Sequence, residues 1–404
     1  MAKTETDINK IDEILDRGTI VDILPTKKDF REKLLSGQVM KFYIGFDATA
    51  PTLHLSHAKN ILLMEKFRKL GHEVIILFGD FTARIGDPSG SSSTRKQLTR
   101  EEVILNVEKW KKLIYPLMDF KNKENPPKIM YNHDWLSKLS FEDILLLASN
   151  LTVQQILERD MFQKRLIANK PIFLQEFLYP LMQGYDSVAM EVDAEVCGTD
   201  QIFNALVGRD LLRKIKNKNK YVVAVTLMEN PKTGELMSKS NGTGVFLDVE
   251  STDLYGQIMS QPDEMIEPLF VNCTLQPLKE IKKVINENSP RNSKAKLAYE
   301  ITKMFHGKKV ADKAQEHFEK TIVKKGLPDK ITKILIIDKN WSVVDLLHFA
   351  KLVPSKNEAR RLIEQGGVKI EGAVIGDREA KIRPTNGMII KVGKRKFVKV
   401  QLDK

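Results

Sequence analysis

The sequence predicts an α/β protein in which a Rossmann-like parallel sheet is followed by a helical domain and a small α+β domain. Three observations support this prediction. Short apolar runs alternate with longer amphipathic segments between residues 40 and 227, as in strands joined by helices. Strand-like runs then stop from residue 251 to residue 323. Residues 341–404 contain 14 Lys and Arg against 7 Asp and Glu, which distinguishes them from the rest of the chain.

The expected strands of the parallel sheet are residues 41–46, 74–78, 128–131, 192–196 and 221–227. A helix is expected over residues 56–70, where the apolar side chains recur at near-helical spacing. Thr99 and Glu102 form a capping-box pattern that predicts the start of the next helix. The expected parts of the chain are residues 1–250 for the sheet domain, with an insertion near 100–175, then 251–324 for the helical domain, 325–340 for a linker and 341–404 for the last domain.

The helical domain is predicted from Leu297, Ile301, Met304 and Phe305, which form one apolar stripe. In the last domain, Ser342 and Asp345 are candidate caps of one helix. A capping box at 355–358 and the glycines at 366–367 bound a second helix. Short strands are expected around 368–370 and 388–392.

Composition excludes several protein classes. The chain has 404 residues, of which 42% are hydrophobic and 29% charged, so it is neither disordered nor collagen-like. It contains no apolar run long enough for a membrane span and begins without a secretory or transit signal, which predicts a cytoplasmic protein. Cys197 and Cys273 are the only cysteines, so neither a disulfide framework nor a cysteine zinc site is expected. The net charge of +12 favours a polyanionic partner.

Two histidines follow the first predicted strand of the sheet. His54 and His57 are three residues apart at a predicted helix start, so their imidazoles share one face beside free backbone N–H groups. Such a site suits phosphate. The alternative is a surface coincidence or half of a metal site, although the other histidines supply no third ligand at zinc spacing.

A Gly- and Ser-rich segment at 234–244 follows the last predicted strand of the sheet. Lys239, flanked by Ser238 and Ser240, could neutralise a polyphosphate there, or it could be an ordinary solvated lysine. Open α/β sheets bind ligands at the carboxyl ends of their strands, which favours the first interpretation.

These two segments resemble the HIGH and KMSKS signatures of the class I aminoacyl-tRNA synthetases. Residues 43–47, 86–90, 179–186 and 197–201 further resemble the tyrosyl-tRNA synthetases, and the resemblance covers almost the whole chain. It implies ATP-dependent activation of tyrosine and its transfer to tRNA(Tyr). ATP would be a substrate, Mg²⁺ would accompany it without a protein metal site, and the chain would be a homodimer joined through helices around residues 101–120 within the insertion.

The resemblance also implies roles for individual residues. Tyr43 and Asp186 would bind the substrate phenol, which needs both a donor and an acceptor. The other implied tyrosine-binding residues are Asp87, Tyr179, Gln183 and Gln201. Those implied to contact adenosine or phosphates are Gly45, Asp47, Thr49, His54, His57, Asp200, Met237 and Lys239.

Three positions depart from the family pattern. Leu236 replaces the first lysine of the KMSKS signature, Ser91 stands where many relatives have a basic residue, and Ser56 replaces a glycine of the HIGH signature. Arg95 or Lys96 could substitute for the missing cation at Ser91. Two alternatives remain open: a tryptophanyl-tRNA synthetase, and a catalytically weakened relative that binds structured RNA.

The basic C-terminal region resembles a small RNA-binding domain. Its candidate tRNA contacts are Lys351, Lys356, Arg360, Arg361, Lys394 and Arg395, with a solvated charged surface as the alternative. A second basic run, Arg213, Lys214, Lys216, Lys218 and Lys220, is interpreted as a solvated helix end.

Overall fold

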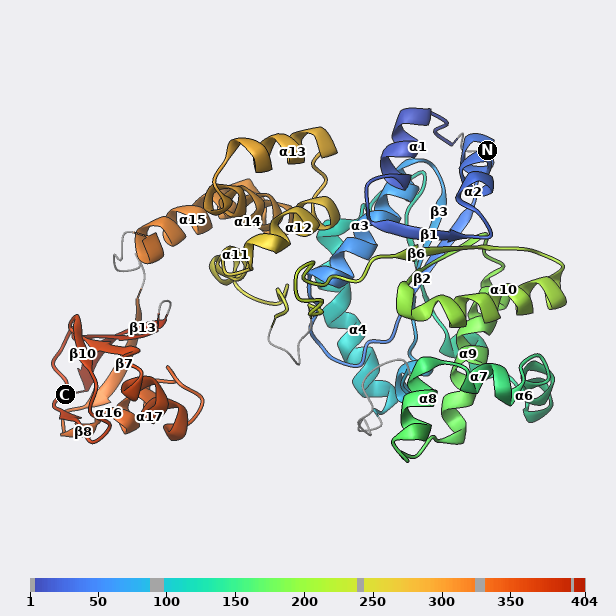
Figure 1. Cartoon of the computed structure of the whole chain (residues 1–404). Helices are drawn as coiled ribbons and strands as arrows, with labels where there is room; N and C mark the ends of the chain where they lie inside the picture. Colours follow the sequence, from blue (N-terminus) through green and yellow to red (C-terminus); the bar gives the residue numbers. More distant parts are fainter. Residues whose placement is uncertain (1–3, 88–97, 238–242, 324–330, 394–395, 404) are drawn as a thin grey trace. The chain divides into compact units, whose positions relative to one another are not determined.

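The computed structural model describes residues 4–87, 98–237, 243–323, 331–393 and 396–403. The chain forms two compact units, residues 1–308 and 309–404, which are described separately below. Most of its helices and strands are labelled in Figure 1.

The first unit contains a six-stranded sheet in the order β1-β6-β5-β2-β3-β4. Its strands are β1 (Ile20–Leu24), β2 (Lys41–Phe46), β3 (Glu73–Phe78), β4 (Lys128–Tyr131), β5 (Ala194–Gly198) and β6 (Tyr221–Val225). The five predicted strands are present, although β5 begins and ends two residues later than expected and β6 ends two residues earlier. The sequence analysis missed β1, which pairs antiparallel with β6 at the edge of the otherwise parallel sheet. Tyr43 lies beside Ile75 and Glu195 in this register.

Helices cover both faces of this sheet (Figure 1). One face carries α2 (Lys27–Leu35) and α3 (Leu55–Lys69), and α1 (Ile8–Leu15) packs on α2. There Phe42 of β2 stacks on Phe67 with ring centroids 4.3 Å apart, and Phe30 meets Phe42 edge-on at 6.0 Å. The other face carries α9 (Leu174–Met190) and α10 (Ile202–Lys216). Because side chains alternate along a strand, Phe42 and Tyr43 point to opposite faces of the sheet. Tyr43 therefore faces α9, where it packs in one buried cluster with Met190.

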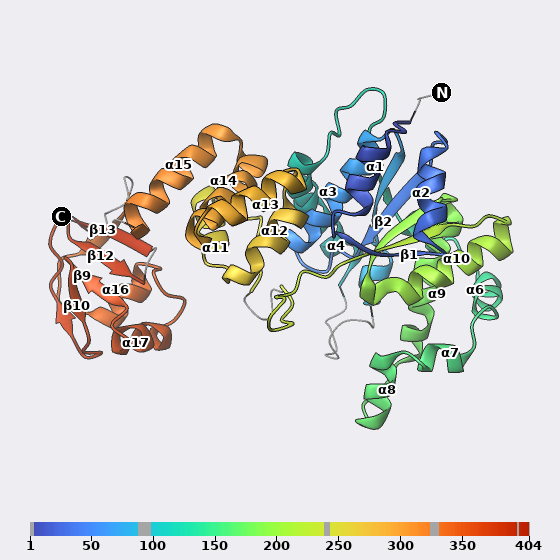
Figure 2. The ribbon, with the colours of Figure 1, turned by 45° about the horizontal axis from the view of Figure 1, so that its top comes forward.

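The residues of the predicted insertion form helices before and after strand β4. These helices are α4 (Arg100–Ile114), α5 (His133–Leu136), α6 (Phe141–Ala148), α7 (Val153–Leu157) and α8 (Asp160–Ile167). The capping box at the start of α4 is confirmed, since Thr99 N donates to Glu102 Oε2 at 2.9 Å and Glu102 N donates to Thr99 Oγ1 at 3.2 Å. Figure 2 shows α7 and α8 projecting away from the sheet.

The end of the first unit is helical, with α11 (Ser251–Met259), α12 (Ile266–Cys273), α13 (Leu278–Glu287) and α14 (Pro290–His306). Leu297 and Ile301 are buried as predicted, whereas Met304 and Phe305 are only partly buried. Single 3₁₀ turns lie at Thr82–Arg84, Tyr115–Leu117, Thr199–Gln201 and Asp263–Met265. The helix α15 (Lys308–Phe318) and a π turn at Glu319–Val323 follow α14 along the chain.

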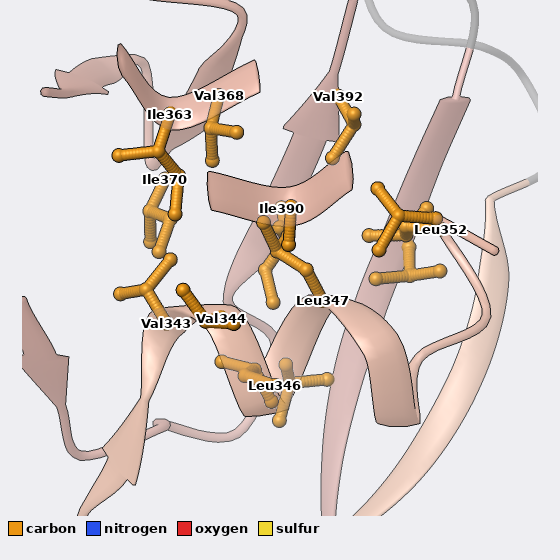
Figure 3. Packing of buried hydrophobic residues seen from close by; sticks show 14 of the residues in the cluster. Val343, Val344, Leu346, Leu347, Leu352, Ile363, Val368, Ile370, Ile390 and Val392 are labelled. Carbon is orange, nitrogen blue, oxygen red and sulfur yellow. The ribbon is translucent and has the colours of Figure 1, made fainter. Parts of the chain in front are cut away.

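The second unit has a five-stranded sheet in the order β10-β9-β12-β13-β7 and a two-stranded sheet of β8 and β11. Two helices, α16 and α17, pack on the larger sheet, and their apolar side chains meet those of β9 and β12 (Figure 3). The elements are β7 (Thr332–Ile337), β8 (Trp341–Ser342), α16 (Val343–Phe349), α17 (Lys356–Glu364), β9 (Val368–Ile370), β10 (Ala373–Ile375), β11 (Lys381–Ile382), β12 (Ile389–Val392) and β13 (Lys396–Asp403).

Three expectations for this unit are corrected. Residues 332–337 are not linker but strand β7, which pairs parallel with β13, because their apolar run completes the sheet. Ser342 makes no side-chain cap at α16, and the Asp345 carboxylate binds Lys356 instead. The 355–358 capping box is half formed, since Ser355 Oγ accepts from the backbone of Glu358 whereas the Glu358 side chain binds Arg361.

Candidate active site

A cavity of about 420 Å³ lies at the carboxyl ends of β2 and β5 and beside the start of α3. It brings together most of the predicted site residues, although they come from distant parts of the chain. The predicted residues that line it are Tyr43, Gly45, Asp47, Thr49, His57, Asp87, Tyr179, Gln183, Asp186, Asp200, Gln201 and Met237. Lys239, Ser91, Arg95 and Lys96 lie outside the described residues.

Tyr43 and Asp186 are buried in the wall of this cavity. The Tyr43 side chain is 1% exposed, and its hydroxyl lies 3.1 Å from Ser187 Oγ. The Asp186 carboxylate accepts hydrogen bonds from Trp135 Nε1 at 2.7 Å and from Asn132 Nδ2 at 3.3 Å. Burial raises the pKa of Asp186 well above its usual value, and burial likewise raises the pKa of Tyr43. A donor and an acceptor for a phenol are therefore both present.

Sequence reasoning missed Asn132 and Trp135. Both follow directly after β4, at the same edge of the sheet as the other site residues. A signal was available, because polar side chains just after a strand of a parallel sheet are candidates for ligand contacts. Asn132 is fully buried and also donates to Thr82 Oγ1 at 3.0 Å, so it links two sides of the cavity.

Tyr179 is joined to Asp47 by a 2.8 Å hydrogen bond from its hydroxyl to Oδ2. The other oxygen of Asp47 accepts from Thr82 Oγ1 at 2.7 Å. A side chain at Gly79 would collide with this pair, since an added Cβ would lie 2.1 Å from Asp47 Oδ1 and 2.2 Å from Thr82 Oγ1. The glycine at the end of β3 thus allows the Asp47 carboxylate to take this position.

Asn204 of α10 holds two predicted glutamines. Its Nδ2 donates to Gln183 Oε1 at 3.0 Å and to Gln201 Oε1 at 2.9 Å. The amide nitrogens then point to carboxylates: Gln183 Nε2 donates to Glu195 Oε1 at 3.1 Å, and Gln201 Nε2 donates to Asp87 Oδ2 at 2.6 Å. Asn204 and Glu195 were not predicted, because their roles depend on packing between α9, α10 and β5.

The paired histidines occupy the start of α3, with His54 at the N-cap. Their ring centroids are 4.1 Å apart, and His57 Nδ1 accepts from the backbone N–H of His54 at 3.4 Å. Because that bond occupies Nδ1, neutral His57 carries its proton on Nε2, where it can donate to a ligand. Burial lowers the pKa of His54 to about 4 and that of His57 to about 3, so both rings are neutral at pH 7. His57 lines the cavity, and the His54 ring lies beside the His57 ring without lining the cavity itself.

The basic run at the end of α10 is not uniformly solvated, contrary to the sequence interpretation. Lys216 pairs with Glu191 and Lys218 with Asp193, each at 2.8 Å, on the surface. Lys220, by contrast, is 1% exposed and forms an ion pair with buried Glu195. The pattern of lysines could not reveal this, because Glu195 comes from a different strand.

The candidate tRNA contacts of the second unit that are described, Lys351, Lys356, Arg360 and Arg361, are exposed. Lys356 pairs with Asp345 at 2.7 Å, and Arg361 pairs with Glu358 at 2.6 Å. Lys394 and Arg395 lie outside the described residues.

Both cysteines are buried and free. Within the described ranges there is no cluster of three or more His, Cys, Asp or Glu that could hold a metal ion. Helices of those same ranges are all too short or too polar to cross a membrane.

The chain matches known proteins over nearly its whole length. Residues 35–322 match the family model described as tRNA synthetases class I (W and Y), and residues 322–400 match the tyrosine–tRNA ligase SYY-like C-terminal domain. Tyrosine–tRNA ligase of Haemophilus influenzae is 40% identical over 99% of this chain and 98% of its own. The tyrosine–tRNA ligase of Thermotoga maritima is 39% identical over 95% of this chain and 96% of its own length.

Solved structures agree in fold. A C-terminally truncated mitochondrial tyrosyl-tRNA synthetase of Aspergillus nidulans has a TM-score of 0.64 at 23% identity, covering 76% of this chain and 92% of its own. The tyrosyl-tRNA synthetase of Archaeoglobus fulgidus, solved with L-tyrosine, has a TM-score of 0.60 at 17% identity. The match covers 76% of this chain and 100% of that one. The predicted fold class and family are thereby confirmed, and this chain belongs to the tyrosine–tRNA ligase family of class I tRNA synthetases.

Proposed function

We propose that this chain activates L-tyrosine with ATP and transfers it to the 3′ end of tRNA(Tyr). In the first step a carboxylate oxygen of tyrosine bonds to the α-phosphorus while the bond to pyrophosphate breaks. In the second step a terminal ribose hydroxyl of tRNA attacks the carbonyl carbon and AMP leaves. One observation supports this most directly: a single cavity has buried Tyr43 and Asp186 in one wall and His57 at a helix start in another.

Recognition of tyrosine is assigned to the end of the cavity formed by β2 and α9. Tyr43 would donate to the phenol oxygen, and Asp186 would accept the phenol proton. Phenylalanine would leave both groups unpaired, and the magnitude of such discrimination, about 10⁵, is known for tyrosyl-tRNA synthetases generally. Asp87, Tyr179 and Gln183 would bind the ammonium group, and Gln201 would face the carboxylate.

The nucleotide would lie toward α3. Gly45, Asp47, Asp200 and Met237 would contact adenosine, while Thr49, His54, His57 and Lys239 would meet the phosphates. Because both imidazoles are neutral, they would act as hydrogen-bond donors, and the positive charge would come from Lys239. Mg²⁺ bound to the phosphates would neutralise part of their charge.

We also propose that the chain works as a homodimer. Large apolar side chains are exposed on the insertion and the start of α9, and such a patch is typical of an interface. On α6 to α9 the exposed ones are Phe141, Leu145, Leu146, Val153, Leu166, Ile167, Phe173 and Leu174. They lie on α6 to α9, which moves the proposed interface from residues 101–120 toward 141–174; on the earlier segment Leu105 and Tyr115 are exposed.

The remaining parts are assigned to tRNA. Residues 1–250 would be catalytic, 251–324 would lie on the anticodon side, 325–331 would join the parts, and 332–404, which include β7, would bind tRNA phosphates. Exposed Lys351 and Arg360 favour this last role. As a translation enzyme of the bacterial type, the protein would act in the cytoplasm.

The decisive experiment is amino-acid-dependent exchange of pyrophosphate into ATP by the purified protein, followed by charging of tRNA(Tyr). We expect exchange with tyrosine, none with tryptophan at equal concentration, and a kcat/KM for phenylalanine lower by about 10⁵. Exchange with tryptophan would identify the alternative synthetase. RNA binding without any exchange would identify a non-catalytic RNA-binding relative.

A further inference from the structure

A buried ion pair lies directly behind the proposed tyrosine site. Lys220 precedes β6, Glu195 lies on β5, and their side chains are 1% and 2% exposed. The Lys220 ammonium donates to Glu195 and, at 2.6 Å, to Ser187 Oγ. Burying two charges costs free energy that their attraction only partly offsets, so stability alone does not explain the pair. Glu195 also lines the cavity, which points to a role in the site.

The contacts of this pair lead to Tyr43. Ser187 Oγ lies 3.1 Å from the Tyr43 hydroxyl, and either oxygen could be the donor. An ammonium group can only donate, so the Ser187 oxygen accepts from Lys220. The single proton of Ser187 can then go to Tyr43, or to Glu195 Oε2 at the longer distance of 3.5 Å. The shorter contact favours Tyr43. Burial raises the pKa of Tyr43, and so does Glu195, which also lies within hydrogen-bond reach of the Tyr43 hydroxyl. The proton therefore stays on Tyr43, and the phenol oxygen of a bound ligand competes with Glu195 for it.

We propose that Lys220, Glu195 and Ser187 are positioning residues that aim the hydroxyl proton of Tyr43 at the phenol oxygen of bound tyrosine. The hydrogen bonds run in one direction, from Lys220 through Ser187 to Tyr43 and then to the substrate. Glu195 fixes the ammonium at the start of this chain, and its second oxygen holds the amide nitrogen of Gln183. This inference rests on the proposed function, because it explains how the proposed enzyme selects a substrate with a hydroxylated ring.

Local packing is built around the arrangement. An added Cβ at Gly208 of α10 would lie 2.8 Å from Lys220 Nζ and 2.9 Å from Ser187 Oγ, so any other residue would occupy the space of the ion pair. The Lys220 ammonium also lies 5.6 Å from the centroid of the Tyr43 ring. The cation thus contacts the ring that it orients as well as the serine between them.

Two variants test the proposal without leaving an unpaired buried charge. Ser187→Ala removes the middle of the hydrogen-bond chain and keeps the ion pair. The double variant Lys220→Met with Glu195→Gln removes both charges and keeps side chains of similar size. Lys218→Met is the matched control, because Lys218 forms a surface ion pair with Asp193 at 2.8 Å only two residues earlier. Urea unfolding establishes that each variant is folded.

The readout is kcat/KM for tyrosine and for phenylalanine in pyrophosphate exchange, together with KM for ATP. We expect Ser187→Ala to lower kcat/KM for tyrosine by roughly tenfold and to leave phenylalanine and the KM for ATP unchanged. Because Glu195 also holds Gln183, we expect the double variant to lower kcat/KM for both amino acids, but to lower that for tyrosine roughly tenfold more. The tyrosine-to-phenylalanine ratio then falls about tenfold, while Lys218→Met leaves it unaltered.

Equal losses of kcat/KM for tyrosine and for phenylalanine would assign the Lys220–Glu195 pair a purely structural role and overturn the proposal. An unchanged tyrosine-to-phenylalanine ratio in folded Ser187→Ala would overturn it as well. If the double variant does not fold, Ser187→Ala decides alone. A wild-type protein without tyrosine-dependent exchange would overturn the proposed function itself. A wild type that discriminates normally, with variants that do so equally well, would overturn this inference only.

Discussion

Trp135 Nε1 donates a 2.7 Å hydrogen bond to Asp186 Oδ1, and this bond opposes the effect of burial on the carboxylate. Burial raises the pKa of Asp186, whereas the hydrogen bonds from Trp135 and Asn132 lower it. The tryptophan therefore helps to keep Asp186 ionised, which is the form that accepts the phenol proton.

Trp135→Phe should weaken the use of tyrosine most strongly at acid pH. Without the indole N–H the pKa of Asp186 rises further, so the carboxylate is lost at a higher pH as the solution is acidified. We expect kcat/KM for tyrosine to fall roughly tenfold at neutral pH and its acid limb to move to higher pH. The control is Trp110→Phe, which replaces a tryptophan of the same cavity that does not bind Asp186. The Trp110 ring packs on His57, with ring centroids 5.2 Å apart. Parallel pH profiles for Trp135→Phe and wild type would contradict the role of the bond.

The buried histidines should make folding stability depend on pH. The pKa of His57 is lowered to about 3 by burial, below its value of about 6.5 in an unfolded chain. Between these values the unfolded state binds the extra proton, so the free energy of unfolding falls as pH decreases, by at most about 1.4 kcal/mol per pH unit for one group. His57→Gln should flatten this slope between pH 6.5 and 4.5 in urea unfolding. Exposed His348→Gln is the control, and an equal slope in both variants would refute the buried neutral state.

The main features of the fold follow from local patterns. The alternation of apolar runs predicts β2 to β6, because buried parallel strands have a continuous apolar sequence. The capping box at Thr99 predicts α4, since its two hydrogen bonds involve residues three positions apart. His54 and His57 are also local, so their placement at a helix start was predictable from spacing alone.

What the sequence did not predict depends on contacts between distant segments. The partners of Lys220 come from α9 and β5, so a run of lysines could only suggest solvation. The strand β7 was mistaken for linker because its partner β13 lies more than 60 residues later. The role of Asn204 was not predictable, because it consists of hydrogen bonds to two glutamines, Gln183 and Gln201, from different elements. Most of the predicted site residues line the cavity, but Asn132 and Glu195, which also line it, were missed, as were the hydrogen bonds that orient the site.

Gly208→Ala should destabilise the protein even though alanine favours helices. Replacing glycine by alanine inside a helix gains about 1 kcal/mol of helix propensity. Here steric overlap outweighs that gain, because the new methyl group would lie 3.2 Å from the Gly184 Cα as well as against Lys220 and Ser187. Overpacking of this kind costs about 1–3 kcal/mol. We expect a lower urea midpoint for Gly208→Ala and little change for Gly376→Ala, where an added Cβ meets nothing within 4 Å. A stabilised Gly208→Ala would disprove the close packing of α9 and α10.

Ile167→Glu should convert the proposed dimer to monomers. Ile167 is 85% exposed on α8, and Leu174 at the start of α9 is 77% exposed. Burying a new carboxylate in a shared interface is costly, whereas on a free surface it is harmless. Sedimentation analysis should give a dimer for wild type and a monomer of unchanged folding stability for the variant. The control is Leu275→Glu, which replaces an exposed leucine between α12 and α13, away from this patch. A wild-type monomer would contradict the assignment.

Truncation after residue 323 should separate the two proposed steps. The cut must precede β7, because ending the chain at residue 340 would expose the buried Ile336 on a strand without its partner β13. We expect the truncated protein to retain tyrosine-dependent pyrophosphate exchange and to lose at least about tenfold in kcat/KM for tRNA charging, since phosphate contacts supply much of the binding free energy. The charging activity of the full chain should fall steeply with salt while that of the truncated chain should not. Lys351→Ala with Arg360→Ala supplies the matched full-length test, because both side chains are exposed. Equal charging by all three proteins would show that the basic second unit does not contact tRNA.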